Sequence, residues 1–490
     1  MTPRCSISLR LLPAPATVAV LSACGGGGTP DSPFIRRLQL GGEDLHGLVA
    51  VRYTIAAKPG ASSKPVSVRY TAAALERRGD LSADRRTLSL PVFGLYAGRL
   101  NHVSVELQFE AAPARTVPVD LATNPYVDGS GIYDRPTILQ RRAAGTPLGF
   151  EYLYVKSGLG SPIVIDTDGE VRWVGAGVAS GFSSAFRDNG FFVGDPKSPK
   201  LTRLELDGSS SEASLASATY TGFHHNIDPG KEGLLVEVDA ASDGVASLES
   251  IVAEVSGAGA VLGEWDFAAI LGAYMAGEGD DPSAFVRPGV DWFHMNSAIY
   301  DARDDSLIVS SRENFVIKVD YQTRDIVWIL GDPTKHWYGF PSLRAKALTL
   351  EQGGLYPIGQ HALSITSDGQ LLLFNDGLAS RNQPAEAPAG ENRTYSAVSA
   401  YAIDPEALTA REVWRFDHDQ TILSSICSSA YEAAEGSLLV NYAVADDWTK
   451  ARLVGLDAAH EVVFDFEYPT HVCDTSWNAA PIPFDDLRFE

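Results

Sequence analysis

The sequence predicts an all-β protein, in which a six-bladed β-propeller follows a small N-terminal β-sandwich. A strand–turn–strand unit recurs about six times between positions 150 and 470, at a spacing of roughly 50 to 65 residues. Residues 33–122 carry shorter runs that alternate apolar and polar residues, with Gly, Pro and Asn between the runs. Helical periodicity is weak over most of the chain, apart from Phe267 to Met275, where we expect one short helix.

The first 24 residues have the pattern of an export signal. Arg4 and Arg10 accompany the apolar stretch from Leu11 to Leu21, which is too short to span a bilayer. The stretch ends in Leu21-Ser22-Ala23-Cys24, which resembles the lipobox of bacterial lipoproteins, so we expect Cys24 to carry a lipid. An ordinary cleaved signal peptide with a chance cysteine is the alternative.

Residues 25–32 read as a Gly-rich tether, and Gly25 rather than Asp after the cysteine favours the outer membrane. We therefore expect an exported protein, periplasmic or at the cell surface, that meets the membrane only through its lipid. The net charge of −23 comes without a compensating basic patch, which argues against nucleic acid as a partner. The sequence leaves the oligomeric state open, and a homodimer is one assembly to test.

A chain of 490 residues is too long for one compact core, so more than one domain is expected. We assign residues 33–122 to the sandwich and residues 123–490 to the propeller. If Cys24 is acylated and Cys5 is removed, Cys427 and Cys473 remain. In an oxidising compartment these two could form a disulfide, and two buried thiols are the equally weighted alternative.

Three segments that begin predicted inner strands contain histidine, namely residues 223–226, 291–297 and 358–363. His225 and His361 each lie eight residues before a glycine that leads into an apolar strand, so they occupy equivalent positions in different blades. His294 lies near the same position with a small offset. Because equivalent positions converge on the channel axis of a propeller, we expect these three imidazoles to face one channel. A structural role for each histidine is the alternative.

Two other functions compete with catalysis. Three histidines near one axis could bind zinc or copper, but Arg312 would repel a cation. No carboxylate lies at close sequence spacing to His361 or His225, although Asp291 is near His294. A non-catalytic binding or scaffold propeller is the second competitor, because the fold alone does not decide the function.

The same segments resemble the bacterial arylsulfate sulfotransferases that do not use a nucleotide sulfate donor. Residues 90–96, followed by Asn101, are similar to a signature at the end of that family's N-terminal sandwich. His294-x-Asn296, with Arg312 eighteen residues after the histidine, is similar to its active-site spacing. Gln360-His361, followed by residues 371–377, is similar to its nucleophile segment. His225, or its neighbour His224, resembles the remaining family histidine.

The resemblance implies transfer of a sulfuryl group from an aryl sulfate donor to a phenolic acceptor, by a ping-pong mechanism without cofactor or metal. It makes His361 the nucleophile that forms a sulfohistidine and His294 the acid/base residue. Arg312, Asn296 and His225 would hold the sulfuryl oxygens. Imidazole is a competent nucleophile near neutral pH, and a planar guanidinium suits anionic oxygens.

The sequence departs from the family pattern at two points. The better-known members carry a short-range disulfide just before the nucleophile segment, whereas Cys427 and Cys473 both follow His361. The residues that select the aryl group have no residue-by-residue match, and Tyr395 is only a weak candidate.

Overall fold

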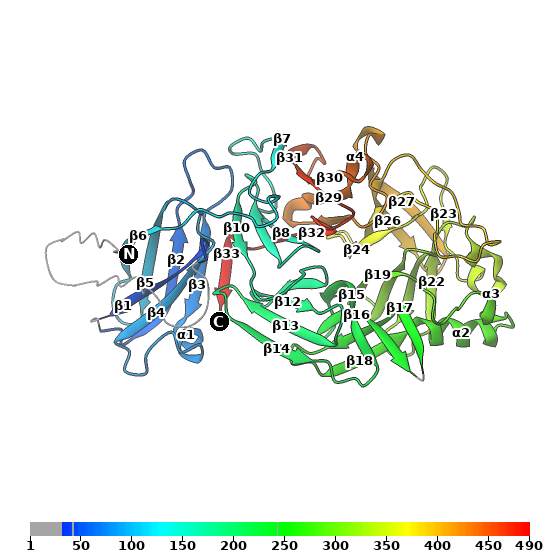
Figure 1. The fold of residues 1–490 in the computed structure, drawn as a ribbon, viewed down its shortest axis with the longest axis horizontal. Helices are drawn as coiled ribbons and strands as arrows, with labels where there is room; N and C mark the ends of the chain where they lie inside the picture. The colour runs from blue at the N-terminus through cyan, green and yellow to red at the C-terminus, as the bar shows by residue number, and fades with distance from the viewer. Residues whose placement is uncertain (1–31, 42–43, 243) are drawn as a thin grey trace.

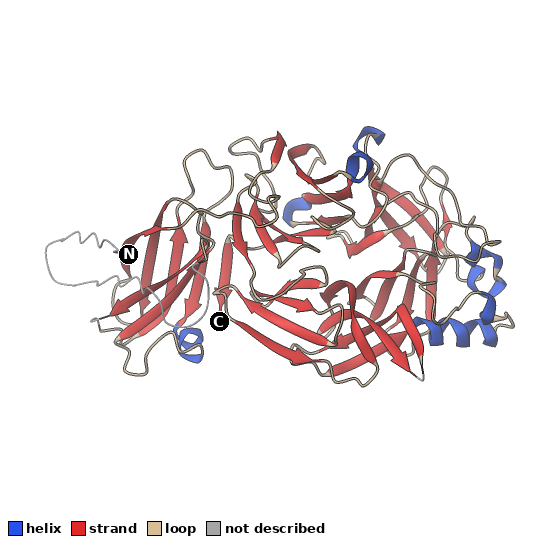
Figure 2. Ribbon diagram, viewed as in Figure 1, coloured by secondary structure: helices blue, strands red, loops and turns tan. Residues whose placement is uncertain are grey.

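The computed structural model describes residues 32–41, 44–242 and 244–490. Within these ranges the protein consists mainly of antiparallel sheets with a few short helices (Figures 1 and 2). The export signal, Cys24 and the tether up to position 31 lie outside the described residues. No helix in the described part of the chain is both long and apolar enough to cross a membrane.

The N-terminal domain is a two-layer sandwich. One layer pairs β1 (Ile35–Gly41) with β4 (Thr87–Phe93). The other has the strand order β33-β3-β2-β5-β6, with bounds Asp486–Phe489, Val66–Thr71, Leu48–Ile55, Leu100–Phe109 and Arg115–Ala122. Buried and less buried residues alternate along β3, as a sheet with one face on a core requires. The short helix α1 (Ala72–Arg77) follows β3.

The C-terminal strand β33 corrects one predicted boundary. Residues 486–489 pair in parallel with β3, so the end of the chain belongs to the sandwich sheet and not to the propeller. Figure 1 shows this red strand beside the blue N-terminal sheet. Leu487 is fully buried within the sandwich core.

Six four-stranded antiparallel sheets follow the sandwich, and we interpret them as the six predicted blades. The first contains β10, β9, β8 and β32 (Val171–Val174, Ile163–Asp166, Tyr152–Lys156, Asn478–Ile482). The second contains β11 to β14 (Ser184–Arg187, Gly190–Gly194, Lys200–Glu205, Ser210–Ser214). The third contains β15 to β18 (Tyr220–Pro229, Leu234–Ser242, Val245–Val255, Val261–Asp266). The all-β propeller class is confirmed.

The remaining three sheets complete the series. The fourth contains β19 to β22 (Met295–Asp301, Ser306–Ser311, Val316–Asp320, Ile326–Leu330). The fifth contains β24 to β27 (His361–Ile365, Leu371–Asn375, Ala397–Asp404, Thr409–Phe416), extended by β23 (Thr349–Leu350). The sixth contains β28 to β31 (Ser429–Glu432, Leu438–Val444, Lys450–Leu456, Val462–Pro469), extended by β7 (Thr137–Gln140).

The sheets follow one another around a common axis. One strand of each sheet contacts the corresponding strand of the next sheet. In order, these strands are β11, β15, β19, β24, β28 and β32. The last and first strands of this series, β32 and β11, are linked through the segments that precede them. There the Trp477 indole donates to the Phe182 carbonyl at 2.7 Å. Strand β32, from the C-terminal part of the chain, also pairs with β8 in the first sheet. This brings the two ends of the propeller sequence into one sheet.

Short helices lie on the loops. The predicted helix is α2 (Phe267–Gly277), whose N-terminus is capped by the Asp266 carboxylate accepting from two backbone N–H groups. The others are α3 (Pro341–Arg344), α4 (Ala445–Trp448) and the 3-10 turns η1 to η4 (Pro282–Ala284, His336–Gly339, His418–Gln420, Ala434–Gly436).

Cys427 and Cys473 form a disulfide that joins the segments before β28 and β32. This pairing resolves the choice between a bridge and two thiols.

Candidate active site

The predicted histidines lie at irregular starts of three successive first strands. Register shifts interrupt the pairing of β15 between Phe223 and Ile227, of β19 after Met295 and of β24 after His361. A residue with positive φ accompanies each shift: His225 (38°), His294 (50°) and Ala362 (52°). Non-glycine residues rarely adopt this conformation, and bulges of this kind turn side chains away from the regular sheet.

The structure brings the predicted site residues together. The rings of His225 and His294 lie 4.8 Å apart between centroids, at an angle of 73°. The Arg312 backbone N–H donates to the carbonyl of His294 at 3.0 Å. The Asn296 side-chain amide donates to the Gln360 carbonyl at 2.8 Å, immediately before His361. Three neighbouring sheets therefore supply one group of side chains.

His361 is a buried, neutral imidazole. Its Nδ1 lies 2.9 Å from the Gly359 carbonyl oxygen, which can only accept, so Nδ1 carries the hydrogen and Nε2 keeps a free lone pair. Burial lowers the pKa of His361 well below its usual range, and the charges of Arg312 and His294 lower it further. The ring is thus in the protonation state that a nucleophile needs.

Asp376 lies on the Nδ1 side of His361, with its Oδ2 at 3.1 Å. This carboxyl is fully buried, and burial raises its pKa well above the usual range even though Arg312 and other cations oppose the shift. The contact with His361 therefore joins two neutral groups and is not an ion pair. Neither carboxyl oxygen of Asp376 has a hydrogen-bond partner within the described residues, and the Gly359 carbonyl accepts the Nδ1 hydrogen of His361.

Arg312 is buried and only partly satisfied. Its Nη1 lies 2.7 Å from Glu313 Oε1, whereas its Nη2 is buried and meets no hydrogen-bond partner in the described part of the chain. A buried guanidinium N–H without a partner is costly, and an anionic oxygen would satisfy it. The buried Lys335 ammonium donates to the carbonyls of Arg312 and Glu313, and burial lowers the pKa of Lys335 to about 8.

His294 is in the opposite protonation state to His361. Its Nδ1 lies 2.6 Å from Asp291 Oδ2 and 2.8 Å from Glu249 Oε2. Burial would lower the pKa of His294, but the two carboxylates outweigh burial and raise it to about 10. His294 is therefore an imidazolium at neutral pH and a source of a proton.

Glu249 is a site residue that sequence reasoning missed. It lies on β17, the third strand of its sheet, and has a positive φ of 47°. Burial raises the pKa of Glu249, but the charges of His225 and His294 outweigh burial and lower it overall. Nothing in the local sequence distinguishes this glutamate, because its closeness to His294 arises from the packing of two neighbouring sheets. The sequence spacing predicts no carboxylate close to His225, but the structure places the Glu249 carboxylate beside it.

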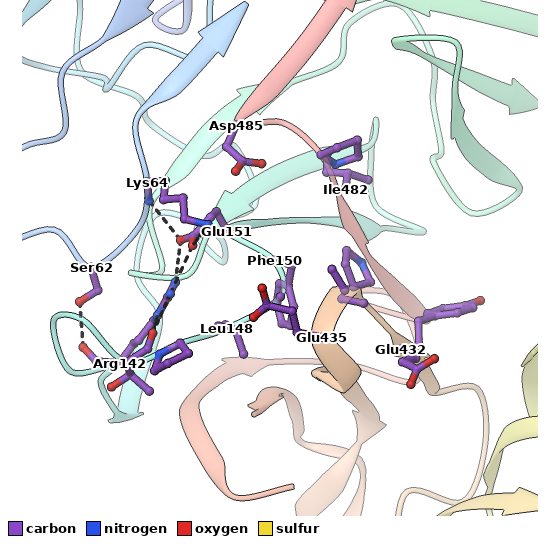
Figure 3. Close-up of a pocket in the computed structure, with 18 of the residues that line it drawn as sticks. Ser62, Lys64, Arg142, Leu148, Phe150, Glu151, Glu432, Glu435, Ile482 and Asp485 are labelled. Carbon is purple, nitrogen blue, oxygen red and sulfur yellow. Dashed lines mark hydrogen bonds and ion pairs between the residues drawn. The ribbon is translucent and has the colours of Figure 1, made fainter. Parts of the chain in front are cut away.

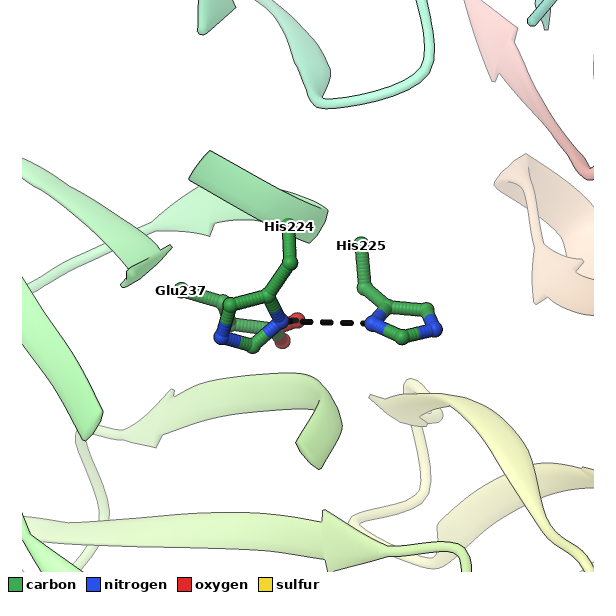
Figure 4. A group of neighbouring side chains, drawn as sticks. All are labelled: His224, His225 and Glu237. Carbon is green, nitrogen blue, oxygen red and sulfur yellow. Dashed lines mark hydrogen bonds and ion pairs between the residues drawn. The ribbon is translucent and has the colours of Figure 1, made fainter. Parts of the chain in front are cut away.

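The choice between His224 and His225 is decided by their directions. His225 lies against His294, whereas His224 is directed to Glu237, whose Oε2 lies 3.8 Å from His224 Nδ1. Figure 4 shows the two rings and Glu237, with the 3.2 Å contact between the two Nδ1 atoms as a dashed line. His225 is the histidine of the site, and burial lowers its pKa well below the usual range.

Two aromatic residues that sequence reasoning also missed lie beside His225. The rings of Phe182 and Trp477 stack at 4.5 Å and 18°. The His225 ring lies 6.0 Å from Phe182 and 5.9 Å from Trp477. Trp477 also packs in a small apolar cluster with Cys473. The segments before β11 and β32 thus supply an aromatic wall next to the histidines.

A cavity of about 850 Å³ lies elsewhere, between the sandwich and the propeller. Figure 3 shows Lys64 and Arg142 at this cavity, both paired with Glu151. None of the five predicted catalytic residues lines it.

The fold and the site define a β-propeller protein with a buried, neutral histidine near a guanidinium that has one nitrogen unsatisfied within the described residues. A sequence profile of the family described as Arylsulfotransferase (ASST) matches residues 144–478. Since the match covers more than half of the chain, the chain belongs to the arylsulfotransferase family. The predicted family is confirmed.

Two curated relatives agree with this family. Arylsulfate sulfotransferase AssT of Escherichia coli O6:H1 is 26% identical over 320 residues, with 52% of each chain covered. Arylsulfate sulfotransferase AssT of Lelliottia amnigena is 24% identical over 482 residues, with 77% of each chain covered. The match with the first relative thus spans about half of that protein's length.

Solved structures give only weak similarity. The Cps50 (Swd1) β-propeller domain of Myceliophteria thermophila is 11% identical, with a TM-score of 0.33 and 67% and 84% of the two chains covered. BamB from Moraxella catarrhalis is 12% identical, with a TM-score of 0.27 and 65% and 82% covered. The description of the fold therefore rests on the sheets of this chain.

Proposed function

We propose that this protein moves a sulfuryl group from an aryl sulfate to a phenolic acceptor, through a sulfohistidine at His361. The observation that carries the proposal is the neutral, buried His361 in the field of Arg312, whose buried Nη2 has no partner in the described residues. The first group can attack sulfur and the second can bind the anionic oxygens. The names of the two relatives support the substrate class.

In the first half-reaction, Nε2 of His361 attacks the sulfur of the donor. The N–S bond forms as the S–O bond to the aryl group breaks, and the leaving phenolate takes a proton from His294. Charge develops on the sulfuryl oxygens and on the leaving oxygen, as in phosphoryl transfer. Arg312 is placed for the sulfuryl oxygens and the imidazolium of His294 for the leaving oxygen.

In the second half-reaction, the acceptor phenol gives its proton to the now neutral His294. Its oxygen then attacks sulfur, the N–S bond breaks and neutral His361 is restored. Asn296 is tied to the Gln360 carbonyl and so fixes the nucleophile segment, and its second N–H stays available for a sulfuryl oxygen. His225 is placed between His294 and the aromatic wall of Phe182 and Trp477, which would pack against the aryl ring.

A direct test uses p-nitrophenyl sulfate as donor, phenol as acceptor and nitrophenolate release as the readout. We expect His361→Ala to lower kcat/KM by at least about 10³-fold, because the covalent route is lost. His102→Ala, at an exposed histidine of the sandwich, is the matched control and should keep full activity. Near-normal activity of His361→Ala would contradict the mechanism.

Covalent sulfation provides a second, independent test. Intact mass after exposure to donor alone should show one added sulfuryl group, which peptide mapping should place at His361. The measurement needs neutral or alkaline solvent, because the adduct is expected to be acid-labile. A stable adduct at another residue would contradict the assignment of the nucleophile.

We also propose that the protein is exported and held at the outer membrane by a lipid on Cys24. The sequence of residues 1–24 supports this, and so does the Cys427–Cys473 disulfide, since disulfides persist in oxidising compartments. Labelling with a radioactive fatty acid should mark the wild-type chain and not Cys24→Ser. Equal labelling of both would contradict the proposal.

A further inference from the structure

A compact group of metal-ligand atoms lies at one end of the site. His225, Glu249 and His294 each offer one donor atom, and the three atoms lie within 4.8 Å of one another. Glu249 Oε2 is 3.6 Å from His225 Nδ1 and 2.8 Å from His294 Nδ1. In a tetrahedral zinc site with ligand bonds of about 2.0 to 2.1 Å, neighbouring donors lie roughly 3.3 Å apart. The two distances bracket that value.

The carboxylate oxygens of this group have unused acceptor capacity. Glu249 Oε2 is buried and makes no hydrogen bond of normal geometry within the described residues, although it lies 2.8 Å from His294 Nδ1. Asp291 Oδ1 is also buried without a hydrogen-bond partner in the described part of the chain. Two carboxylate groups therefore lie beside one ring nitrogen of His294, which can donate a hydrogen to only one of them, whereas a cation would attract both.

The residue expected to repel a cation is partly neutralised by a neighbouring carboxylate. Nη1 of Arg312 contacts Glu313, whose carbonyl also accepts from Lys335. The ligand group itself is reachable, since the side chains of His225, Glu249 and His294 remain 12%, 22% and 23% exposed. The three side chains are therefore not sealed from solvent, although Glu249 Oε2 itself is buried.

We propose that His225, Glu249 and His294 bind one divalent transition-metal ion of the Zn²⁺ type, and that this ion blocks sulfuryl transfer. Mixed imidazole and carboxylate ligands suit Zn²⁺, whereas Mg²⁺ prefers oxygen ligands and retains its water. An ion on His294 Nδ1 replaces the proton held there and occupies the acid/base residue. The blocking half of the proposal rests on the proposed function, and the binding half does not.

The binding half is tested by isothermal titration calorimetry on the full chain, prepared without a histidine tag and freed of metal by chelator. We expect one Zn²⁺ per chain and no heat from MgCl₂ at the same concentration. Glu249→Gln should weaken Zn²⁺ binding at least about tenfold, because it removes a charged ligand. If this variant fails to fold, as judged by circular dichroism, His225→Gln takes its place.

Glu237→Gln is the matched control. Glu237 belongs to the adjoining group with His224 and His225, shown in Figure 4, and this substitution should leave Zn²⁺ affinity within about twofold. Loss of binding in Glu237→Gln and not in Glu249→Gln would place the ion in that other group and overturn the proposal. Absence of Zn²⁺ binding up to about 1 mM would also overturn it.

The blocking half is tested by nitrophenolate release with and without one equivalent of Zn²⁺. We expect suppression of at least about tenfold, reversed by chelator, because the proton donor is lost. Zn²⁺ that binds without slowing transfer would overturn this half. A metal-free protein with no transfer at all would instead contradict the proposed function, and calorimetry would still decide whether the ion binds.

Discussion

At the residue scale, two histidines of one site are held in opposite protonation states by their surroundings. His361 is buried next to the positive charge of Arg312, so its pKa falls and the ring is neutral. His294 faces Asp291 and Glu249, so its pKa rises to about 10 and the ring is charged. In the proposed mechanism, one residue type would thus supply both a nucleophile and an acid at the same pH.

The low pKa of His361 predicts activity that persists in mildly acidic solution. Only neutral His361 can attack, so kcat/KM should be lost as pH falls through the lowered pKa and not near the ordinary histidine value of about 6.5. The pH profile of kcat/KM for p-nitrophenyl sulfate measures this. Donors with different leaving groups should give the same acidic limb, and a limb centred near 6.5 would contradict the prediction.

Activity should fall even when Arg312 is replaced by lysine. Arg312→Lys keeps the charge but loses the planar fork, so we expect kcat/KM to fall by about 10²-fold, and Arg312→Ala should cost more. Arg303→Lys, on a mostly exposed arginine paired with Asp301, is the control and should retain activity. Wild-type rates in Arg312→Lys would show that the fork does not bind the sulfuryl group.

At the element scale, the site residues lie where the first strands of three successive sheets begin and where their pairing is irregular. The regular strand would direct neighbouring side chains to opposite faces, whereas the bulges of β15, β19 and β24 turn histidines toward one another. The disulfide also connects secondary-structure elements, because it joins the segments that lead into β28 and β32.

Removing the disulfide should lower stability and loosen the aromatic wall. The bridge spans a sequence separation of 46 residues, so the Cys427→Ser/Cys473→Ser variant should lose about 2 to 4 kcal/mol of unfolding free energy. Trp477 packs with Cys473, so KM for the aryl donor should rise more than kcat falls. Urea unfolding and steady-state kinetics measure the two effects. Reductant should reproduce them in the wild type and change nothing in the variant.

At the scale of the whole molecule, the C-terminal segment holds the two domains together. Strand β32 pairs with β8 in the first sheet of the propeller, and β33 then pairs with β3 in the sandwich. The sandwich core continues into the first two sheets of the propeller through Tyr152, Trp173 and Phe191. We therefore expect the domains to unfold together.

Leu487 on β33 tests this coupling. Leu487→Ala should cost about 2 to 4 kcal/mol of unfolding free energy, because the side chain is fully buried. Arg488→Ala, at an exposed neighbour on the same strand, should cost less than about 0.5 kcal/mol. Chemical denaturation followed by tryptophan fluorescence compares them. Equal stability of both variants would show that β33 does not contribute to the core.

The sequence by itself determined the features that repeat or lie close together along the chain. Strand periodicity indicated the all-β propeller, and the spacing of His294, Asn296 and Arg312 indicated the family. Such patterns can be recognised without knowing which residues are in contact. The all-β architecture, the helix at Phe267–Gly277 and the closeness of His225 to His294 agree with what the sequence indicated.

Only the tertiary structure decided which distant residues complete the site and the domains. Glu249 reaches His294 from a neighbouring sheet, Trp477 reaches His225 from the segment before β32, and β33 returns to the sandwich. Packing between sheets and the pairing of β33 with β3 set these contacts, and no local spacing encodes them. The protonation states depend on these contacts as well, because the pKa of a buried histidine is set by whichever charges the fold places beside it.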